Sequence, residues 1–222
     1  MPRLPARRRC TSFQPMRNRP WLAGWMAVLA LATACGRPVD TRPPEGGAML
    51  PRPILKPDFV LTDQDGRPFD FRKDTEGYAT LLFFGYTHCP DVCPVQMSNI
   101  ASVMQRMPPE EVRLIKVVFV TTDPARDDAA RLKAWLGALN PAFIGLRGPI
   151  DTVNAITASI GFPGAFIEDT TKKDYTVGHL AVVFAFTRDD SAHVLYPFGT
   201  RQVDWARDLP RLAHAYAPPG TE

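Results

Sequence analysis

Two cysteines in one short segment have the residue type and spacing to bind a soft metal ion or to exchange electrons. Cys89 and Cys93 are separated by three residues in GYTHCPDVCP, which follows an apolar run. Pro94 suits the first turn of a helix, so we place Cys93 at about the N-cap. A thiolate there is stabilised by free N–H groups and by the helix dipole. Two such thiols bind a metal or form a disulfide reversibly, and a purely structural disulfide is the alternative interpretation.

A metal site needs a third ligand, and His179 is the best candidate among the four histidines. His179 directly precedes the apolar segment LAVVFAF. In a thioredoxin-like sheet, the loop before this strand faces the active-site cysteines, and we expect His179 there. The ring of His88 is expected to point away from the thiols. His193 and His214 are expected at surface positions, on an edge strand and a terminal helix.

Two carboxylates follow the next predicted strand, in the segment TTDPARD. Asp123 and Asp127 are expected at the same edge of the sheet as the cysteine loop. There they can tune the site or dock a partner. The alternative is that they cap the helix that begins at about residue 127.

The hydrophobic pattern predicts the elements that position these side chains. Residues 79–85 form a continuous apolar run, as expected for a strand buried on both faces. Further strands are predicted at 59–61, 69–71, 112–120, 143–146, 180–186 and 194–198, and helices at 95–107, 127–139, 150–160 and about 205–216. We expect Pro210 to break or restart the last helix. This order predicts an α/β protein with a thioredoxin-like fold, in which helices flank a central mixed sheet and a β-hairpin turning at Asp65-Gly66 forms an N-terminal extension.

The charge distribution excludes one class of partner. The 222 residues contain 26 Lys and Arg and 23 Asp and Glu, for a net charge of +3. Six of the arginines and none of the acids lie in residues 1–35, so the remainder has 20 basic and 23 acidic side chains. A nucleic-acid-binding protein carries its positive charge on a folded face, so we expect no nucleic-acid partner. With 45% hydrophobic and 22% charged residues, the chain is neither disordered nor a multi-span membrane protein.

The first 57 residues are predicted to export and tether the protein. Residues 21–34 carry no charge but are shorter than the roughly 20 residues of a spanning helix, so residues 1–35 are typical of a secretory signal. The segment ends in ATACG, which resembles a bacterial lipoprotein box and implies lipidation of Cys35. An uncleaved signal-anchor is the alternative, and translation starts at Met1 or Met16. Residues 36–57 contain six prolines and are predicted to be an extended linker without a folded element, followed by one domain at 58–222.

Five segments together resemble the Sco/SenC family: FFGYTHCPDVCP, FVTTDPARD, FIGLRG, YTVGHLAVVF and YPFG, in this order through about residues 54–215. The resemblance implies a thioredoxin-like protein anchored to the membrane on its periplasmic or outer side. It implies one copper ion, Cu(I) or Cu(II), bound by Cys89, Cys93 and His179. Two family positions differ, because Gly178 stands where Asp is frequent and Leu180 where Ser is common.

The family resemblance also implies a function. Family members are metallochaperones that help to assemble the binuclear copper centre of cytochrome c oxidase subunit II. A periplasmic copper donor and a thioredoxin-like reductant are further expected partners. The alternative is a thiol–disulfide oxidoreductase that uses Cys89 and Cys93 as a redox pair on the oxidase subunit or on other exported proteins. Two thiolates and an imidazole suit Cu(I); zinc also accepts this set, but an open three-ligand site favours transfer.

Overall fold

The computed structural model describes residues 45–167 and 174–214. The predicted signal segment and Cys35 lie outside these residues. Among the described residues, no helix combines the length and the apolar character that crossing a bilayer requires.

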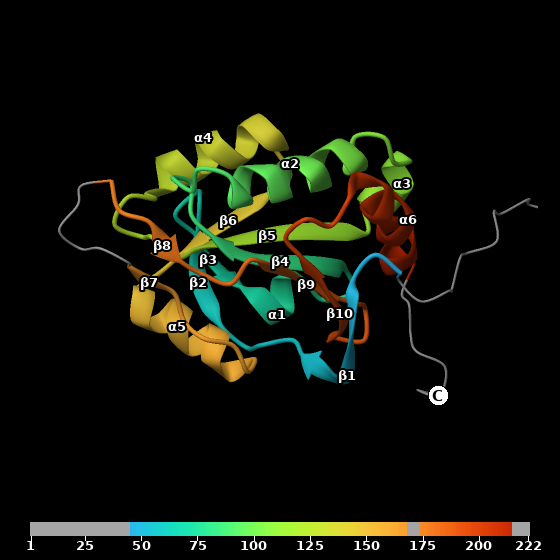
Figure 1. Cartoon of the computed structure of the whole chain (residues 1–222), viewed down its shortest axis with the longest axis horizontal. Coiled ribbons are helices and arrows are strands. Elements are labelled where there is room, and N and C mark those ends of the chain that lie inside the picture. Colours follow the sequence, from blue (N-terminus) through green and yellow to red (C-terminus); the bar gives the residue numbers. More distant parts are fainter. Residues whose placement is uncertain (1–44, 168–173, 215–222) are drawn as a thin grey trace, which may run out of the picture. The chain divides into compact units, whose positions relative to one another are not determined.

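Eight of the described strands form one mixed sheet, in the order β1-β10-β9-β4-β5-β6-β2-β3 (Figure 1). β4 pairs in parallel with β5, and β5 in parallel with β6, whereas the other neighbours are antiparallel. A separate two-stranded ribbon is formed by β7 and β8. The strands are β1 (Ala48–Leu55), β2 (Val60–Asp63), β3 (Pro68–Asp70), β4 (Ala79–Gly85), β5 (Ile115–Thr121), β6 (Ile144–Arg147), β7 (Phe166–Ile167), β8 (Val177–Gly178), β9 (Val182–Phe186) and β10 (Ser191–Pro197).

Helices cover both faces of this sheet. In Figure 1, α2, α4 and α6 lie on one side of the sheet, and α1 and α5 lie on the other. The helices are α1 (Phe71–Asp74), α2 (Val92–Met104), α3 (Pro109–Val112), α4 (Ala129–Leu139), α5 (Ile150–Ser159) and α6 (Gln202–Ala213). The predicted α/β class with a central mixed sheet is therefore confirmed.

β4 shows why a continuous apolar run forms the middle of such a sheet. All seven of its residues are buried. Leu81 and Phe83 belong to the core beneath α2 and α4, whereas Leu82 and Phe84 belong to the core that α5 covers. Because successive side chains of a strand point to opposite faces, both faces of β4 must be apolar.

The predicted N-terminal hairpin is confirmed as β2 and β3. Gly66 has a φ of 80°, which a residue with a side chain adopts at a cost. The Asp63 carboxylate accepts the backbone N–H groups of Asp65 and Arg67 and so stabilises the turn. The hairpin joins the main sheet because β2 also pairs with β6.

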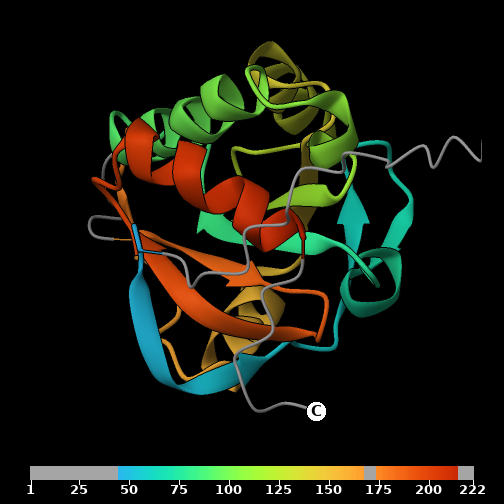
Figure 2. The same cartoon turned by 90° about the vertical axis from the view of Figure 1, so that its right-hand side faces the viewer.

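The prediction that residues 36–57 hold no folded element is wrong from Ala48 onward. Residues 48–55 form β1, an edge strand that pairs with β10 (Figure 2). The register shifts between Met49 and Ile54, the stretch that contains Pro51 and Pro53. Proline is tolerated in an edge strand or at a bulge, because the missing N–H is not required by a second neighbour.

The prediction that Pro210 interrupts the last helix is also wrong, since α6 continues through it to Ala213. Proline removes one intrahelical hydrogen bond, which packing can offset. Trp205, Leu209 and Leu212 are almost completely buried and fix α6 against the core.

Candidate metal centre

The structure brings the three predicted ligands together from three elements. Cys89 lies in the loop after β4, Cys93 in the first turn of α2, and His179 directly after β8. Their sulfur and ring nitrogen atoms all lie within 4.8 Å of one another. Among the described residues, this is the one such group of metal-ligating side chains that contains cysteine or histidine.

Helix α2 begins earlier than predicted, so Cys93 lies inside the helix rather than at its N-cap. The N-cap is Asp91, whose carboxylate accepts the N–H of Val92 at 2.6 Å. Pro94 then stands at the third helical position, where an N–H would still have no intrahelical partner. The N–H of Cys93 is one of the free donors of this first turn, and it donates to the Cys89 sulfur at 3.4 Å.

The two thiols differ strongly in acidity. Hydrogen bonds from the Cys93 thiol and backbone lower the pKa of Cys89 to about 5, against the opposing effect of burial. The pKa of Cys93 is raised, because its thiol donates to Cys89 and because it is completely buried. Near neutral pH, the reduced pair therefore holds one negative charge, centred on the more exposed sulfur.

The ring of His179 is oriented for ligation. Its Nδ1 lies 3.2 Å from the Leu180 carbonyl oxygen, which can only accept, so Nδ1 carries a hydrogen. Nε2 is then the ring atom that faces the thiols, 3.5 Å from the Cys93 sulfur. The rings of Tyr86 and Phe83 contact the imidazole edge to face, with centroid distances of 5.5 and 6.1 Å. A fixed tautomer with the second nitrogen aimed at the metal position is typical of a histidine ligand.

Asp127 is fully buried and orders the loop that carries Cys89. Its carboxylate accepts from the Thr87 backbone N–H at 2.9 Å, from the Thr87 hydroxyl at 2.6 Å and from the Thr121 hydroxyl at 2.7 Å. The alternative role as a helix cap is wrong for Asp127, because Asp128 caps α4. Asp127 therefore joins the end of β5 to the cysteine loop.

The remaining histidines do not contribute to the group. His88 turns its Nδ1 to Asp127, 3.3 Å from the carboxylate. His214, after α6, is half-buried and lies 3.7 Å from Glu111. The prediction that His193 is at the surface is wrong: it is buried, and its Nε2 lies 2.8 Å from Asp189. β1 covers the strand that carries it, so β10 is not an edge.

Asp123 lies in a second cluster, beside the segment that carries His179. Arg126 bonds the Asp123 carboxylate at 2.5 Å and the Tyr175 carbonyl at 2.9 Å. The Tyr175 hydroxyl donates to Asp123 at 2.8 Å. Asp123 was predicted from the sequence, whereas Arg126 and Tyr175 were not, although both belong to motifs quoted above. Arg126 follows Asp123 by three residues, but Tyr175 lies 52 residues beyond Asp123, and no spacing rule connects these two.

Two glycines near the ligands have neighbours that leave no room for a side chain. A Cβ at Gly85 would stand 2.8 Å from the Cys93 sulfur and 3.0 Å from the rings of Phe83 and Phe119. A Cβ at Gly178 would stand 2.5 Å from the Phe166 ring. Glycine at 178 thus accompanies an aromatic ring packed on the backbone next to His179.

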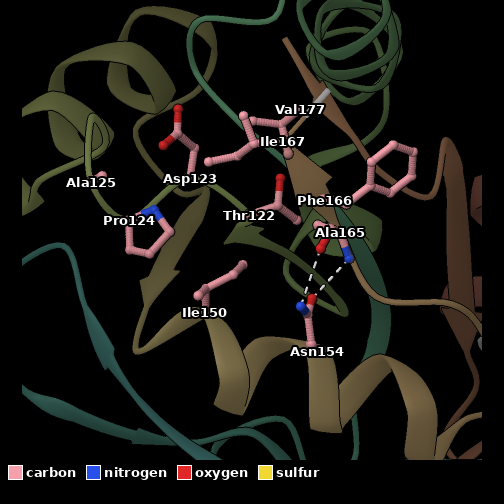
Figure 3. A pocket seen from close by; sticks show the side chains of 10 residues that line it. All are labelled: Thr122, Asp123, Pro124, Ala125, Ile150, Asn154, Ala165, Phe166, Ile167 and Val177. Atoms are coloured by element: carbon pink, nitrogen blue, oxygen red, sulfur yellow. Dashed lines mark hydrogen bonds between the residues drawn. The ribbon is translucent and has the colours of Figure 1, made fainter. Parts of the chain in front are cut away.

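A pocket of about 340 Å³ adjoins this region (Figure 3). Asp123 and Pro124 line it on one side, Val177 and Phe166 on another, and Asn154 at its base. The Asn154 side chain donates a hydrogen bond to the Ala165 carbonyl and accepts one from the Ala165 backbone N–H. The rest of the lining is mainly apolar.

The donor set fits a soft metal ion. Two sulfurs and one imidazole nitrogen are the ligands that Cu(I) prefers, and zinc also accepts them. A reversible disulfide is the other chemistry open to the two thiols, which are both free in this structure.

Comparison with known proteins gives one consistent result. The SCO1/SenC family pattern matches residues 47–214. Bradyrhizobium japonicum ScoI with copper bound has 32% sequence identity and a TM-score of 0.60, over 71% of this chain and 99% of that one. BsSco, reported with a disulfide switch as a member of the Sco family of cytochrome c oxidase assembly proteins, has 16% identity and a TM-score of 0.58, over 75% of this chain and 98% of that one. The latter likeness shows the thioredoxin-like fold alone.

Among full-length relatives, the mitochondrial SCO2 homolog of Mus musculus is 30% identical over 133 residues. This match covers 60% of the present chain, and the chain spans about half the length of that relative, 52%. The matched pattern covers the whole of the fold described above, from β1 to α6. The chain belongs to the SCO1/SenC family.

Proposed function

We propose that this protein is a metallochaperone that carries one copper ion on Cys89, Cys93 and His179 and delivers it during assembly of cytochrome c oxidase. The observation that carries the proposal is the convergence of two sulfurs and the Nε2 atom of His179 within 4.8 Å. The copper-bound relative from Bradyrhizobium japonicum supports the choice of metal.

The geometry suits a cargo ion that must leave again. Cys93 is completely buried, Cys89 is 8% exposed, and His179 is partly exposed. A thiolate from an acceptor protein can therefore approach on the side of Cys89 and His179 and replace them in turn, while Cys93 keeps hold of the ion. A closed four-ligand site would hold the metal permanently.

The acceptor and the location complete the proposal. The acceptor is the binuclear copper site of cytochrome c oxidase subunit II, and a periplasmic copper donor supplies the ion. Residues 1–35 direct export, and lipid at Cys35 holds the protein at the membrane, facing the periplasm or the cell exterior. Membership of the SCO1/SenC family, which the sequence resemblance associates with oxidase assembly, supports the acceptor, and the basic start and short apolar core support the anchor.

Asp123 and Asp127 support the site without binding the ion. Asp127 acts through Thr87 on the cysteine loop, and Asp123 acts through Arg126 on the segment before His179. Supporting residues of this kind orient metal ligands, and their loss typically weakens metal affinity about 10- to 100-fold.

Copper titration of the reduced protein tests the proposal. We expect one copper per chain, thiolate-to-Cu(II) charge-transfer absorption, and loss of tight binding in His179→Ala. His214→Ala is the matched control, since this half-buried histidine lies outside the ligand group. Binding of copper by His179→Ala as tightly as by the wild type would contradict the three-ligand site.

A second candidate function is a thiol–disulfide oxidoreductase, favoured by the contrast between the two thiols. Cys89 is acidic and partly accessible, whereas Cys93 is buried with a raised pKa. This contrast is typical of an attacking and a resolving cysteine, in which the thiolate and the thiol pass two electrons to a substrate disulfide and release one proton as they become a disulfide themselves. A thioredoxin-like reductant would restore the dithiol.

Oxidase assembly in a deletion strain separates the two functions. The copper function requires His179, whereas the reductase requires the cysteines alone. If His179→Ala restores oxidase activity while binding no copper, the reductase becomes the better description. If only the wild type restores it, the copper function holds.

A further inference from the structure

We propose that Arg126 is a positioning residue that holds the segment 175–179, and with it His179, at the cysteines. This inference rests on the proposed copper function and adds a residue to it. The Arg126 cluster, defined as Asp123, Arg126 and Tyr175, joins the loop after β5 to the segment that leads into His179.

Arg126 makes three different contacts across this junction. Its Nε donates to the Asp123 carboxylate at 2.5 Å, and its Nη2 donates to the Tyr175 carbonyl at 2.9 Å. Its guanidinium carbon also lies 3.6 Å from the centroid of the Tyr175 ring. The Tyr175 hydroxyl closes the cluster by donating to the other oxygen of Asp123 at 2.8 Å.

The cluster is well shielded from solvent. The Arg126 side chain is 19% exposed and that of Asp123 only 2%. Hydrogen-bonded charges in such surroundings are stronger than exposed ion pairs, which contribute little. Asp123 is further fixed because its backbone N–H donates to the Thr121 hydroxyl at 3.0 Å. The cluster therefore attaches the His179 segment to the rigid end of β5.

A short two-stranded ribbon also attaches the segment to the described part of the chain. β8 contains only Val177 and Gly178, and its partner β7 is equally short. Both residues of β7, Phe166 and Ile167, are exposed. The Val177 N–H reaches the Tyr86 hydroxyl at a long 3.4 Å. The Arg126 cluster therefore adds hydrogen bonds and a ring contact to a segment whose own ribbon is only two residues long.

The Arg126 cluster is linked to the His179 ring through Tyr86. Tyr86, which accepts from Val177, also packs its ring against the His179 imidazole at 5.5 Å. The Arg126 guanidinium lies 5.7 Å from the same Tyr86 ring. Arg126 thus contacts Tyr175 at the start of the segment and Tyr86, the ring that packs on His179.

Arginine is specifically required by this arrangement. Its planar fork donates in two directions while its face stacks on an aromatic ring, whereas the lysine ammonium is a compact point charge that cannot do both. Arg126→Lys keeps the charge and removes the geometry, so it separates positioning from a general electrostatic effect. Arg67→Lys is the matched control, because Arg67 is an exposed arginine on the β2–β3 turn.

The test combines amide hydrogen exchange of the reduced, metal-free protein with Cu(I) affinity from chelator competition. In Arg126→Lys we expect at least tenfold faster exchange at residues 176–180, and Cu(I) binding about 10- to 100-fold weaker. Tyr175→Phe should give a smaller loss, since it keeps the ring but not the hydroxyl. Arg67→Lys should match the wild type in both measurements.

Each other outcome has a defined meaning. Wild-type exchange and affinity in Arg126→Lys would overturn the proposal. Faster exchange with unchanged copper affinity would also overturn it, because the cluster would then be structural only. A wild-type protein that binds no copper contradicts the proposed function instead, and the exchange comparison still decides whether the cluster holds the segment.

Discussion

Cys89 and Cys93 are separated by only three residues, yet their pKa values shift in opposite directions. The pKa of Cys89 is lowered to about 5 by hydrogen bonds from the Cys93 thiol and backbone. Only the thiolate form of a cysteine attacks iodoacetamide, and the thiolate fraction rises as the pH passes through the pKa. Alkylation of the reduced, metal-free protein should therefore reach half its maximal rate near pH 5 and stay constant above about pH 6.5, as followed by mass spectrometry.

The same experiment has an internal control in the partner thiol. Cys93→Ala removes the largest cause of the lowered pKa, so the midpoint for Cys89 should move to higher pH. A wild-type midpoint near 8.5, the value of an ordinary thiol, would show that these hydrogen bonds do not stabilise the Cys89 thiolate.

Gly85 gives a second prediction at the residue scale. Gly85→Ala places a methyl group 2.8 Å from the Cys93 sulfur. Overpacking of this kind costs about 1–3 kcal/mol, and the displaced sulfur should weaken Cu(I) binding at least tenfold. Denaturant unfolding and chelator competition measure the two effects.

Gly137→Ala is the matched control for Gly85→Ala. A Cβ at Gly137, within α4, would meet nothing within 4 Å. The substitution should raise stability by about 0.5–1 kcal/mol and leave copper binding unchanged. Equal behaviour of the two alanine variants would contradict the close packing of Gly85 on Cys93.

Residue types, their positions along the chain and the family resemblance predicted the group of Cys89, Cys93 and His179, but not the residues that position them. Cysteine and histidine reveal their chemistry in the sequence, so Cys89, Cys93 and His179 were identifiable. Arg126 and Tyr175 meet only after folding, and arginine and tyrosine occur in many other roles. Asp127 was noticed, yet its contact with Thr87 depends on how β4 and β5 pair, which no local pattern specifies.

At the scale of elements, buried strands were predictable and β1 was not. β4 could be predicted from its continuous apolar run, whereas β1 is mainly exposed and contains two prolines. Its strand character comes from pairing with β10, a long-range interaction. The same omission explains the wrong prediction for His193, because β1 makes β10 an internal strand. Helix α2 was shifted by three residues because Asp91, rather than Cys93, provides the cap.

Alanine substitutions of two basic residues in the predicted linker should therefore have very different effects on the free energy of unfolding. The Lys56 side chain is fully buried, 2.7 Å from Asp190 and 3.2 Å from the Thr75 carbonyl. Removing one partner of a buried pair is strongly destabilising, and because Asp190 is partly exposed we expect Lys56→Ala to lose about 2–4 kcal/mol in denaturant unfolding. Arg52→Ala, at an exposed position of β1, should stay within about 0.5 kcal/mol. Equal, negligible effects would restore the linker interpretation.

At the scale of the whole molecule, the start of the described chain is fastened far from the ligands. Asp208 of α6 is fully buried and accepts the backbone N–H groups of Glu45 and Gly46 and the Tyr196 hydroxyl. Figure 1 shows α6 and the start of β1 at the end of the sheet opposite β8. The attachment at Asp208 should therefore contribute to stability without affecting the ligand group.

Asp208→Asn tests this separation. The carboxylate lies 3.8 Å from the buried Arg211 and 3.2 Å from Arg207. Loss of its charge should lower the free energy of unfolding by about 3 kcal/mol. Copper affinity of the folded variant should remain within twofold of the wild type. A parallel loss of affinity would show that the two ends are coupled.

The opposite pKa shifts of the two thiols have a consequence for the net charge of the whole protein. Because Cys89 is already a thiolate near neutral pH and the pKa of Cys93 is raised, the two cysteines lose only the proton of Cys93 when Cu(I) binds. One positive charge enters as another leaves, so loading with Cu(I) is electroneutral. Isoelectric focusing should thus fail to separate the empty from the Cu(I)-loaded protein, while Cu(II) adds a positive charge and shifts the band to higher pH. A partner that distinguishes loaded from empty protein must then respond to the shape of the Cys89 loop rather than to its charge.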